Sequence, residues 1–194
     1  MLTLGLARSG EGEPPAQTDG KIHIRLLNQR DATAYRDLRL RGLKEAPTAF
    51  GSSYEDESRL RLKKFARKLR RRDESADAVF GAFSGPAQLV GILDFNRDNR
   101  PKRRHVAVLG GLFVAPEFQG QGYGGRLIDE AIAHARQLNG VRQILLAVTA
   151  GNVAAGSLYR SRGFKCYGLE PDAILVEGKH YDMELMMLNL QTVS

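Results

Sequence analysis

The stretch PEFQGQGYGGRL, residues 116–127, is the most informative part of this sequence. It joins the apolar run VAVLGGLFV (106–114), typical of a buried strand, to RLIDEAIAHARQL (126–138), whose apolar residues recur at helical spacing. Glycines occupy positions 120, 122, 124 and 125 at the entrance to that helix, although glycine costs about 1 kcal/mol relative to alanine inside a helix. Glycine has no Cβ to hold a ligand away from the backbone, and a helix N-terminus offers unpaired N–H donors. The stretch therefore predicts a loop that binds an anionic group, such as a diphosphate.

This loop is similar to two nucleotide-binding motifs, but it lacks the residues that the chemistry of those motifs requires. Three of the glycines satisfy the dinucleotide pattern Gly-x-Gly-x-x-Gly, yet the acidic residue expected about 20 positions later is absent, since no Asp or Glu occurs between Glu130 and Glu170. A P-loop is disfavoured because Arg126 and Leu127 stand where lysine and a hydroxyl residue are needed. A plain turn or helix cap does not explain four glycines in six positions.

The segment Gln119-Gly120-Gln121-Gly122-Tyr123-Gly124 resembles the Gln/Arg-x-x-Gly-x-Gly/Ala loop of the GNAT superfamily, the acetyl-CoA-dependent N-acyltransferases. The surroundings resemble the family as well: a strand, Pro and Glu precede the loop, and a helix, a strand, Asn152 and Tyr159 follow it. The resemblance covers about residues 21–190 in element order and is sharpest over about 105–164.

Hydrophobic periodicity predicts the element order β-α-α-β-β-β-α-β-α-β-β. Asp31 is expected to cap the first helix, and Ser53 to begin a second amphipathic helix that continues through the basic segment 59–72. The strands are expected at 21–27, 78–83, 88–95, 105–114, 143–148 and 164–169, followed by a closing hairpin of 174–178 with 180–188. The resemblance implies an α/β (α+β) GNAT fold, a single mixed, twisted sheet of about seven strands with helices on both faces.

Composition limits the other classes of protein. Of 194 residues only Cys166 is a cysteine, which excludes an internal disulfide and a cysteine zinc cluster, and no metal site is expected. The sequence lacks a run of 18 apolar residues and a basic signal-peptide start, so no membrane association and a cytoplasmic location are expected. Residues 1–20 are predicted to be a disordered tail, and residues 21–194 a single N-acetyltransferase domain.

The resemblance assigns the coenzyme, acetyl-CoA as a cosubstrate, to one set of residues. Strand residues would pair through their backbone with the pantetheine arm, and the glycine loop would bind the pyrophosphate. Gly110-Gly111 within the strand is expected to mark a bulge or a close approach of the backbone. The expected coenzyme-binding residues are Leu112, Phe113, Val114, Gln119, Gly120, Gln121, Gly122, Tyr123, Gly124, Gly125, Asn152 and Tyr159.

The catalytic groups are less fully specified. Tyr159 matches the position from which family members protonate the departing thiolate, although an aromatic residue here also suits a helical core. The strand that holds the base in many relatives contains no carboxylate. Glu57 and Glu55, at the start of the second helix, are the candidate bases, with His105 as a further possibility.

The predicted function is transfer of an acetyl group from acetyl-CoA to a primary amine, on a small molecule or a peptide, with the acceptor unknown. The alternative is a non-catalytic acetyl-CoA sensor or a nucleic-acid-binding module on the same fold. Segment 59–72 has nine Lys or Arg, but its apolar face and its few aromatic residues favour a solvated surface, so nucleic acid is not an expected partner. The net charge of +7 mildly favours an acidic acceptor, and a homodimer is compatible with these features.

Overall fold

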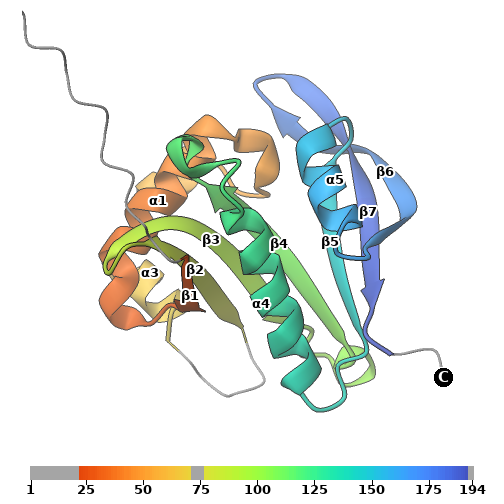
Figure 1. Ribbon diagram of the computed structural model, residues 1–194. Coiled ribbons are helices and arrows are strands. Elements are labelled where there is room, and N and C mark those ends of the chain that lie inside the picture. The colour runs from red at the N-terminus through yellow and green to blue at the C-terminus, as the bar shows by residue number, and fades with distance from the viewer. Residues whose placement is uncertain (1–21, 71–76, 192–194) are drawn as a thin grey trace, which may run out of the picture.

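The computed structural model describes residues 22–70 and 77–191, and these form one mixed seven-stranded sheet with helices on both faces (Figure 1). The strand order is β1-β2-β3-β4-β5-β7-β6. The strands are β1 His23–Leu26, β2 Ala78–Ser84, β3 Gln88–Arg97, β4 Val106–Val114, β5 Gln143–Thr149, β6 Lys165–Val176 and β7 Lys179–Asn189. The helices are α1 Ala32–Glu45, α2 Tyr54–Ser58, α3 Leu62–Lys68, α4 Tyr123–Gln137 and α5 Val153–Arg160. The predicted fold class is confirmed, whereas the predicted tail, residues 1–20, lies outside the described residues.

The two faces of the sheet have separate cores, because successive side chains of a strand point to opposite sides. On β3, Ile92 packs on the side of α1 and α3, and Leu93 packs on the side of α4. Tyr35 on α1 and Leu127 on α4 are among the fully buried side chains of these two cores. The apolar stripes of these helices, which the sequence showed, are therefore the surfaces that hold them on the sheet.

The sheet divides between β4 and β5, its one parallel pair among the described residues. These strands pair only from Val106 with Gln143 to Val108 with Leu145. Beyond that point β4 continues to Val114 beside β3, while β5 continues to Thr149 beside β7. The strands therefore diverge and leave an opening in the middle of the sheet, visible in Figure 1 where β4 and β5 separate.

Three local expectations were wrong. The second helix is divided into α2 and α3 at residues 59–61; it begins as predicted, with the Ser53 hydroxyl accepting from the backbone N–H of Asp56. The first helix has Asp31 at its N-cap without a capping bond, because the carboxylate accepts from Arg25 and from the N–H of Asn28 instead. The strands expected at 164–169 and 174–178 are one strand, β6, whose register shifts between Glu170 and Ile174, so the intervening residues form a bulge.

Candidate active site

The predicted irregularity at Gly110-Gly111 is a β-bulge in β4, which confirms that expectation. Asp94 of β3 pairs with Gly110, and Ile92 pairs with Phe113, so two residues of β4 face one residue of β3. Gly111 has φ +59°, a conformation that L side chains rarely adopt. The bulge lies just before Leu112, Phe113 and Val114, the residues predicted to bind the pantetheine arm.

Among the described residues, β4 from Leu109 to Val114 pairs with β3 alone. Its other edge faces the opening between β4 and β5. An unpaired strand edge presents N–H and C=O groups that can bond to an extended ligand containing amides. Leu112 is partly buried and Phe113 and Val114 are buried, so the side chains anchor this segment while one backbone edge is left without a partner strand.

The glycine loop follows directly, and two of its glycines are required by the backbone. After a single 3-10 turn at Pro116–Phe118, Gly120 has φ +74° and Gly122, the N-cap of α4, has φ +87°. A Cβ at Gly120 would have no neighbour within 4 Å, and one at Gly122 would have only an Ile22 methyl at 3.9 Å. The chain thus leaves open space in front of both positions.

The backbone N–H groups of residues 120–125 donate no hydrogen bond to any residue that the structure describes. Six consecutive donors at the N-terminus of a 15-residue helix, together with the positive end of its dipole, form a suitable site for an anion. The side chains of the two glutamines stabilise the loop from within: Gln119 Nε2 donates to the carbonyl of Val114 at 2.9 Å, and Gln121 Nε2 donates to the carbonyl of Glu117 at 3.1 Å. Buried Tyr123 packs edge-on against Phe118 below the loop.

At Gly124 and Gly125 the missing Cβ leaves room for neighbouring side chains. A Cβ at Gly124 would lie 3.3 Å from a Leu158 methyl of α5, and one at Gly125 would collide with the guanidinium of Arg162. Arg162, which the sequence did not single out, lies across the first turn of α4 with its Nε 3.4 Å from Asp129 Oδ1. Its nearness to this turn depends on the docking of α5 against α4, which the sequence alone does not specify.

Tyr159 lies on α5, is only 7% exposed and contacts Phe164 with ring centroids 5.8 Å apart. Burial raises the pKa of its hydroxyl to about 12, so the group carries a proton at neutral pH. This state suits a general acid, and the same burial suits a core residue. Asn152 is exposed and caps α5, with its Oδ1 accepting from the N–H of Ala155 at 3.1 Å. The coenzyme contacts of both residues stay predictions.

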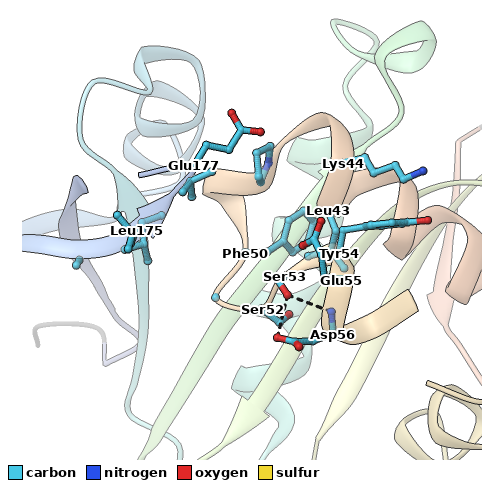
Figure 2. Close-up of a pocket in the computed structure, with 15 residues that line it drawn as sticks. Leu43, Lys44, Phe50, Ser52, Ser53, Tyr54, Glu55, Asp56, Leu175 and Glu177 are labelled. Carbon is cyan, nitrogen blue, oxygen red and sulfur yellow. Dashed lines mark hydrogen bonds between the residues drawn. The ribbon is translucent and has the colours of Figure 1, made fainter. Parts of the chain in front are cut away.

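A cavity of about 850 Å³ lies between the α1–α2 segment and the β6–β7 hairpin. Figure 2 shows Leu175 and Glu177 of the hairpin facing Leu43, Phe50 and Tyr54 across it. The cavity approaches β4 through Phe50, which lines it and whose ring lies 6.4 Å from that of Phe113. Its charged lining residues are Lys44, Glu55, Asp56 and Glu177.

The two candidate bases occupy different environments. Glu55 lines the cavity and is exposed. Glu57 does not line it and is bound by Arg39, whose Nη2 donates to Oε1 at 2.7 Å and whose Nε donates to Oε2 at 3.1 Å. Burial opposes the charge on Glu57, but hydrogen bonds from Arg39 and Ser52 lower its pKa below the usual value. A base gains from a raised pKa, so this environment favours Glu55 over Glu57. His105 is exposed at the opposite end of β4 from Val114.

Neither a metal-ligand group nor a membrane-spanning helix is found in the described part of the chain. No three His, Cys, Asp or Glu side chains there are grouped so as to hold a metal ion, and none of the described helices could cross a membrane. In the basic segment Lys68 is paired with Asp94, but six exposed cations make no ion pair with any described carboxylate. These cations are Arg59, Arg61, Lys63, Lys64, Arg67 and Arg70.

The chain is similar to known acetyltransferases in sequence and in structure. An uncharacterized N-acetyltransferase of Methanocaldococcus jannaschii is 34% identical over 97 residues, which are 50% of this chain and 42% of that protein. A GNAT-family acetyltransferase from Streptococcus pneumoniae superposes with a TM-score of 0.75 at 25% identity, over 87% of this chain and 99% of that one. A putative acetyltransferase from Salmonella typhimurium, solved with its cofactor acetyl-CoA, has a TM-score of 0.73 at 21% identity over 90% of this chain and 96% of that one.

The chain spans less than half the length of the curated relatives that it matches. The sequence model of the family described as "Acetyltransferase (GNAT) family" matches residues 41–164, which include the end of α1, the β4 bulge, the glycine loop and α5. On this match the chain belongs to the GNAT family of acetyltransferases.

Proposed function

We propose that the protein transfers an acetyl group from acetyl-CoA to a primary amine held in the cavity beside β4. One observation carries the proposal: an unpaired strand edge ends in a glycine loop whose six N–H groups have no acceptor among the described residues. The edge suits the amides of pantetheine, and the loop suits a pyrophosphate. A coenzyme bound along both would place its thioester near the β4 bulge, next to the cavity.

The residues can then share the steps of a direct transfer. The amine nitrogen forms a bond to the thioester carbon, the carbon–sulfur bond breaks, and the sulfur leaves as a thiolate. Tyr159 supplies the proton for the thiolate, since its pKa of about 12 keeps it protonated at neutral pH. An alkylammonium with a pKa near 10.4 must lose a proton before it attacks, so a base is needed. Glu55 lines the cavity and is the better placed candidate, and Glu57 reaches the cavity only through Ser52.

The charge of the cavity favours a cationic acceptor. Three carboxylates, Glu55, Asp56 and Glu177, line it together with Lys44, whose Nζ lies 4.2 Å from the ring centroid of Tyr54. The positive charge of the whole chain favoured an acidic acceptor. Groups that touch the acceptor act at shorter range and through less water than the rest of the surface, so the local charge is the better guide.

Thiol release measured with a disulfide reagent tests the proposal. Purified protein and acetyl-CoA would be mixed with spermidine, a lysine-containing peptide, a peptide with a free N-terminus and L-methionine sulfone. Amine-dependent release of thiol, with an acetylated product found by mass spectrometry, is the expected result. Saturable binding of acetyl-CoA without transfer to any of a broad set of amines would favour the sensor instead.

The nucleic-acid alternative depends on the six cations of the basic surface that pair with no described carboxylate. Phosphate contacts would make binding strongly dependent on salt. A gel-shift series with duplex DNA and single-stranded RNA from 25 to 200 mM salt tests it, and we expect no retention; retention that falls steeply with salt would support the module. The cytoplasmic location, the homodimer and the domain limits 21–194 stay predictions.

A further inference from the structure

A buried ionic cluster lies between α1 and the β4 bulge. Arg39 of α1 is 7% exposed and Asp94 of β3 is 8% exposed, so both are buried charges. The Asp94 carboxylate accepts from Lys68 Nζ at 2.6 Å and from the Tyr35 hydroxyl at 3.5 Å, and Arg39 Nη1 lies 3.9 Å from it. Burial opposes the charge on Arg39, yet its carboxylate partners raise its pKa above the usual value. Arg39 is therefore a permanent cation inside the protein.

Arg39 binds the acceptor side of the site through two side chains. Its Nη2 donates to Glu57 Oε1 at 2.7 Å and to Ser52 Oγ at 2.8 Å, and Ser52 in turn donates to Glu57 at 2.5 Å. Ser52 lines the cavity. These bonds connect the two ends of the segment 52–57. Residues 52–56 of this segment, including Glu55 and Asp56, form one wall of the cavity. We call residues 51–57 the acceptor loop.

Arg39 contacts the donor side at Gly111. A Cβ added to Gly111 would lie 2.8 Å from Arg39 Nη1 and 3.3 Å from Asp94 Oδ2, so the guanidinium and the carboxylate occupy the space over the bulge. The guanidinium also stacks on Phe50, with Cζ 4.4 Å from the ring centroid. One side chain thus contacts the bulge of β4, the floor of the cavity and the acceptor loop.

The composition of this cluster indicates that it positions the segments around it. Apolar residues of similar volume often stabilise a core as well as a buried ion pair does, because burial of charge costs solvation. A guanidinium, however, fixes the direction of several acceptors at once through its planar fork. Here the acceptors belong to α2 and to the loop before it, and the carboxylate of Asp94 on β3 lies at ion-pair distance.

We propose that Arg39 is a positioning residue that holds the acceptor loop in a fixed place relative to the β4 bulge, and so sets the position of the amine relative to the thioester. The statement about the reaction rests on the proposed function. The mechanical connection between the loop and the bulge does not, and it can be tested separately.

Hydrogen–deuterium exchange and calorimetry with acetyl-CoA test the proposal. In Arg39→Met, amides 51–57 should exchange at least about tenfold faster than in the wild type, while α4 exchanges at the wild-type rate and acetyl-CoA binds within about threefold of wild-type affinity. Acetyl-CoA should slow exchange of the loop in the wild type and not in Arg39→Met. Arg39→Lys keeps the charge without the fork, so it should behave like Arg39→Met.

Arg25→Met is the matched control. The two terminal nitrogens of Arg25 donate to the two carboxylate oxygens of Asp31, both at 2.7 Å, and its guanidinium stacks on the ring of Phe83. Arg25→Met should leave exchange of the acceptor loop unchanged. Should Arg39→Met fail to fold, Glu57→Gln tests the same connection from its other end and should speed exchange of the loop. Unchanged loop exchange, or an equal increase in the loop and in α4, would overturn the proposal. Absence of acetyl-CoA binding in the wild type would instead refute the proposed function. The exchange rates of the acceptor loop in the free proteins would then still test whether Arg39 holds this loop in place.

Discussion

Replacement of Gly122 by valine tests whether the loop binds the coenzyme pyrophosphate. Gly122 has φ +87° at the N-cap of α4, where an L residue costs about 1–2 kcal/mol. A new Cβ would meet only an Ile22 methyl at 3.9 Å, so the protein itself has room for it. The melting temperature should therefore fall by about 2–8 °C, with the fold kept.

The affinity for acetyl-CoA should fall by more than the stability of the fold does. A phosphate oxygen bonded to this backbone would lie about 2.9 Å from a nitrogen, which leaves no room for an intervening side chain. Loss of one charge-assisted hydrogen bond costs about 1.5–3 kcal/mol, which corresponds to a loss of roughly 10- to 150-fold in affinity. Isothermal titration calorimetry with acetyl-CoA measures this loss directly.

Gly85→Val is the matched control. Gly85 also has a positive φ, +64°, and open space around it, but it lies in the turn between β2 and β3. The two variants should lose similar stability, and Gly85→Val should bind acetyl-CoA like the wild type. Equal affinity in Gly122→Val and the wild type would refute the assignment of the loop.

Three further predictions concern the catalytic groups. Tyr159→Phe should lower kcat by about 10²-fold or more while the Kd for acetyl-CoA changes less than about twofold; unchanged turnover in the thiol-release assay would remove Tyr159 as the acid. Glu55→Gln should lower turnover and remove the acidic limb of the pH–rate profile, and a wild-type profile would exclude Glu55 as the base. Glu57 has a lowered folded pKa, so its ion pair stabilises the fold above its unfolded pKa near 4.5, and this stability is lost as the pH falls through the folded pKa. Below pH 4.5 the wild type should therefore lose its stability advantage over Glu57→Gln in unfolding experiments, and an advantage independent of pH would contradict the assignment.

The parts of the fold that follow from local sequence were predictable. The glycine loop, the apolar stripes of α1 and α4 and the bulge at Gly110-Gly111 all depend on residues close together in the chain. The division between α2 and α3 was not predicted, because the helical spacing that ends in Phe65 and Leu69 also continues through the residues before them. The core buries Phe65 and Leu69 but not those earlier residues. Leu60 and Leu62 are exposed, so nothing in the core holds them in the same helix.

The acceptor side of the site could not be predicted, because segments far apart in the chain build it. Its cavity joins residues 43–56 to residues 173–177, and no local pattern reports that contact. The ionic cluster did leave a signal in the sequence: Arg39 lies four residues after Tyr35, on the same stripe of α1, and Asp94 interrupts the apolar strand β3. A charge on a buried stripe costs free energy unless it is paired, so two such charges indicate a partnership.

Calorimetric titration of the full chain with acetyl-CoA, with NADH in parallel, tests the central claim most directly. Saturable one-to-one binding of acetyl-CoA, with no heat of binding for NADH, is the result that the β4 edge and the glycine loop predict. Binding of NADH alone, or of neither compound, would contradict it.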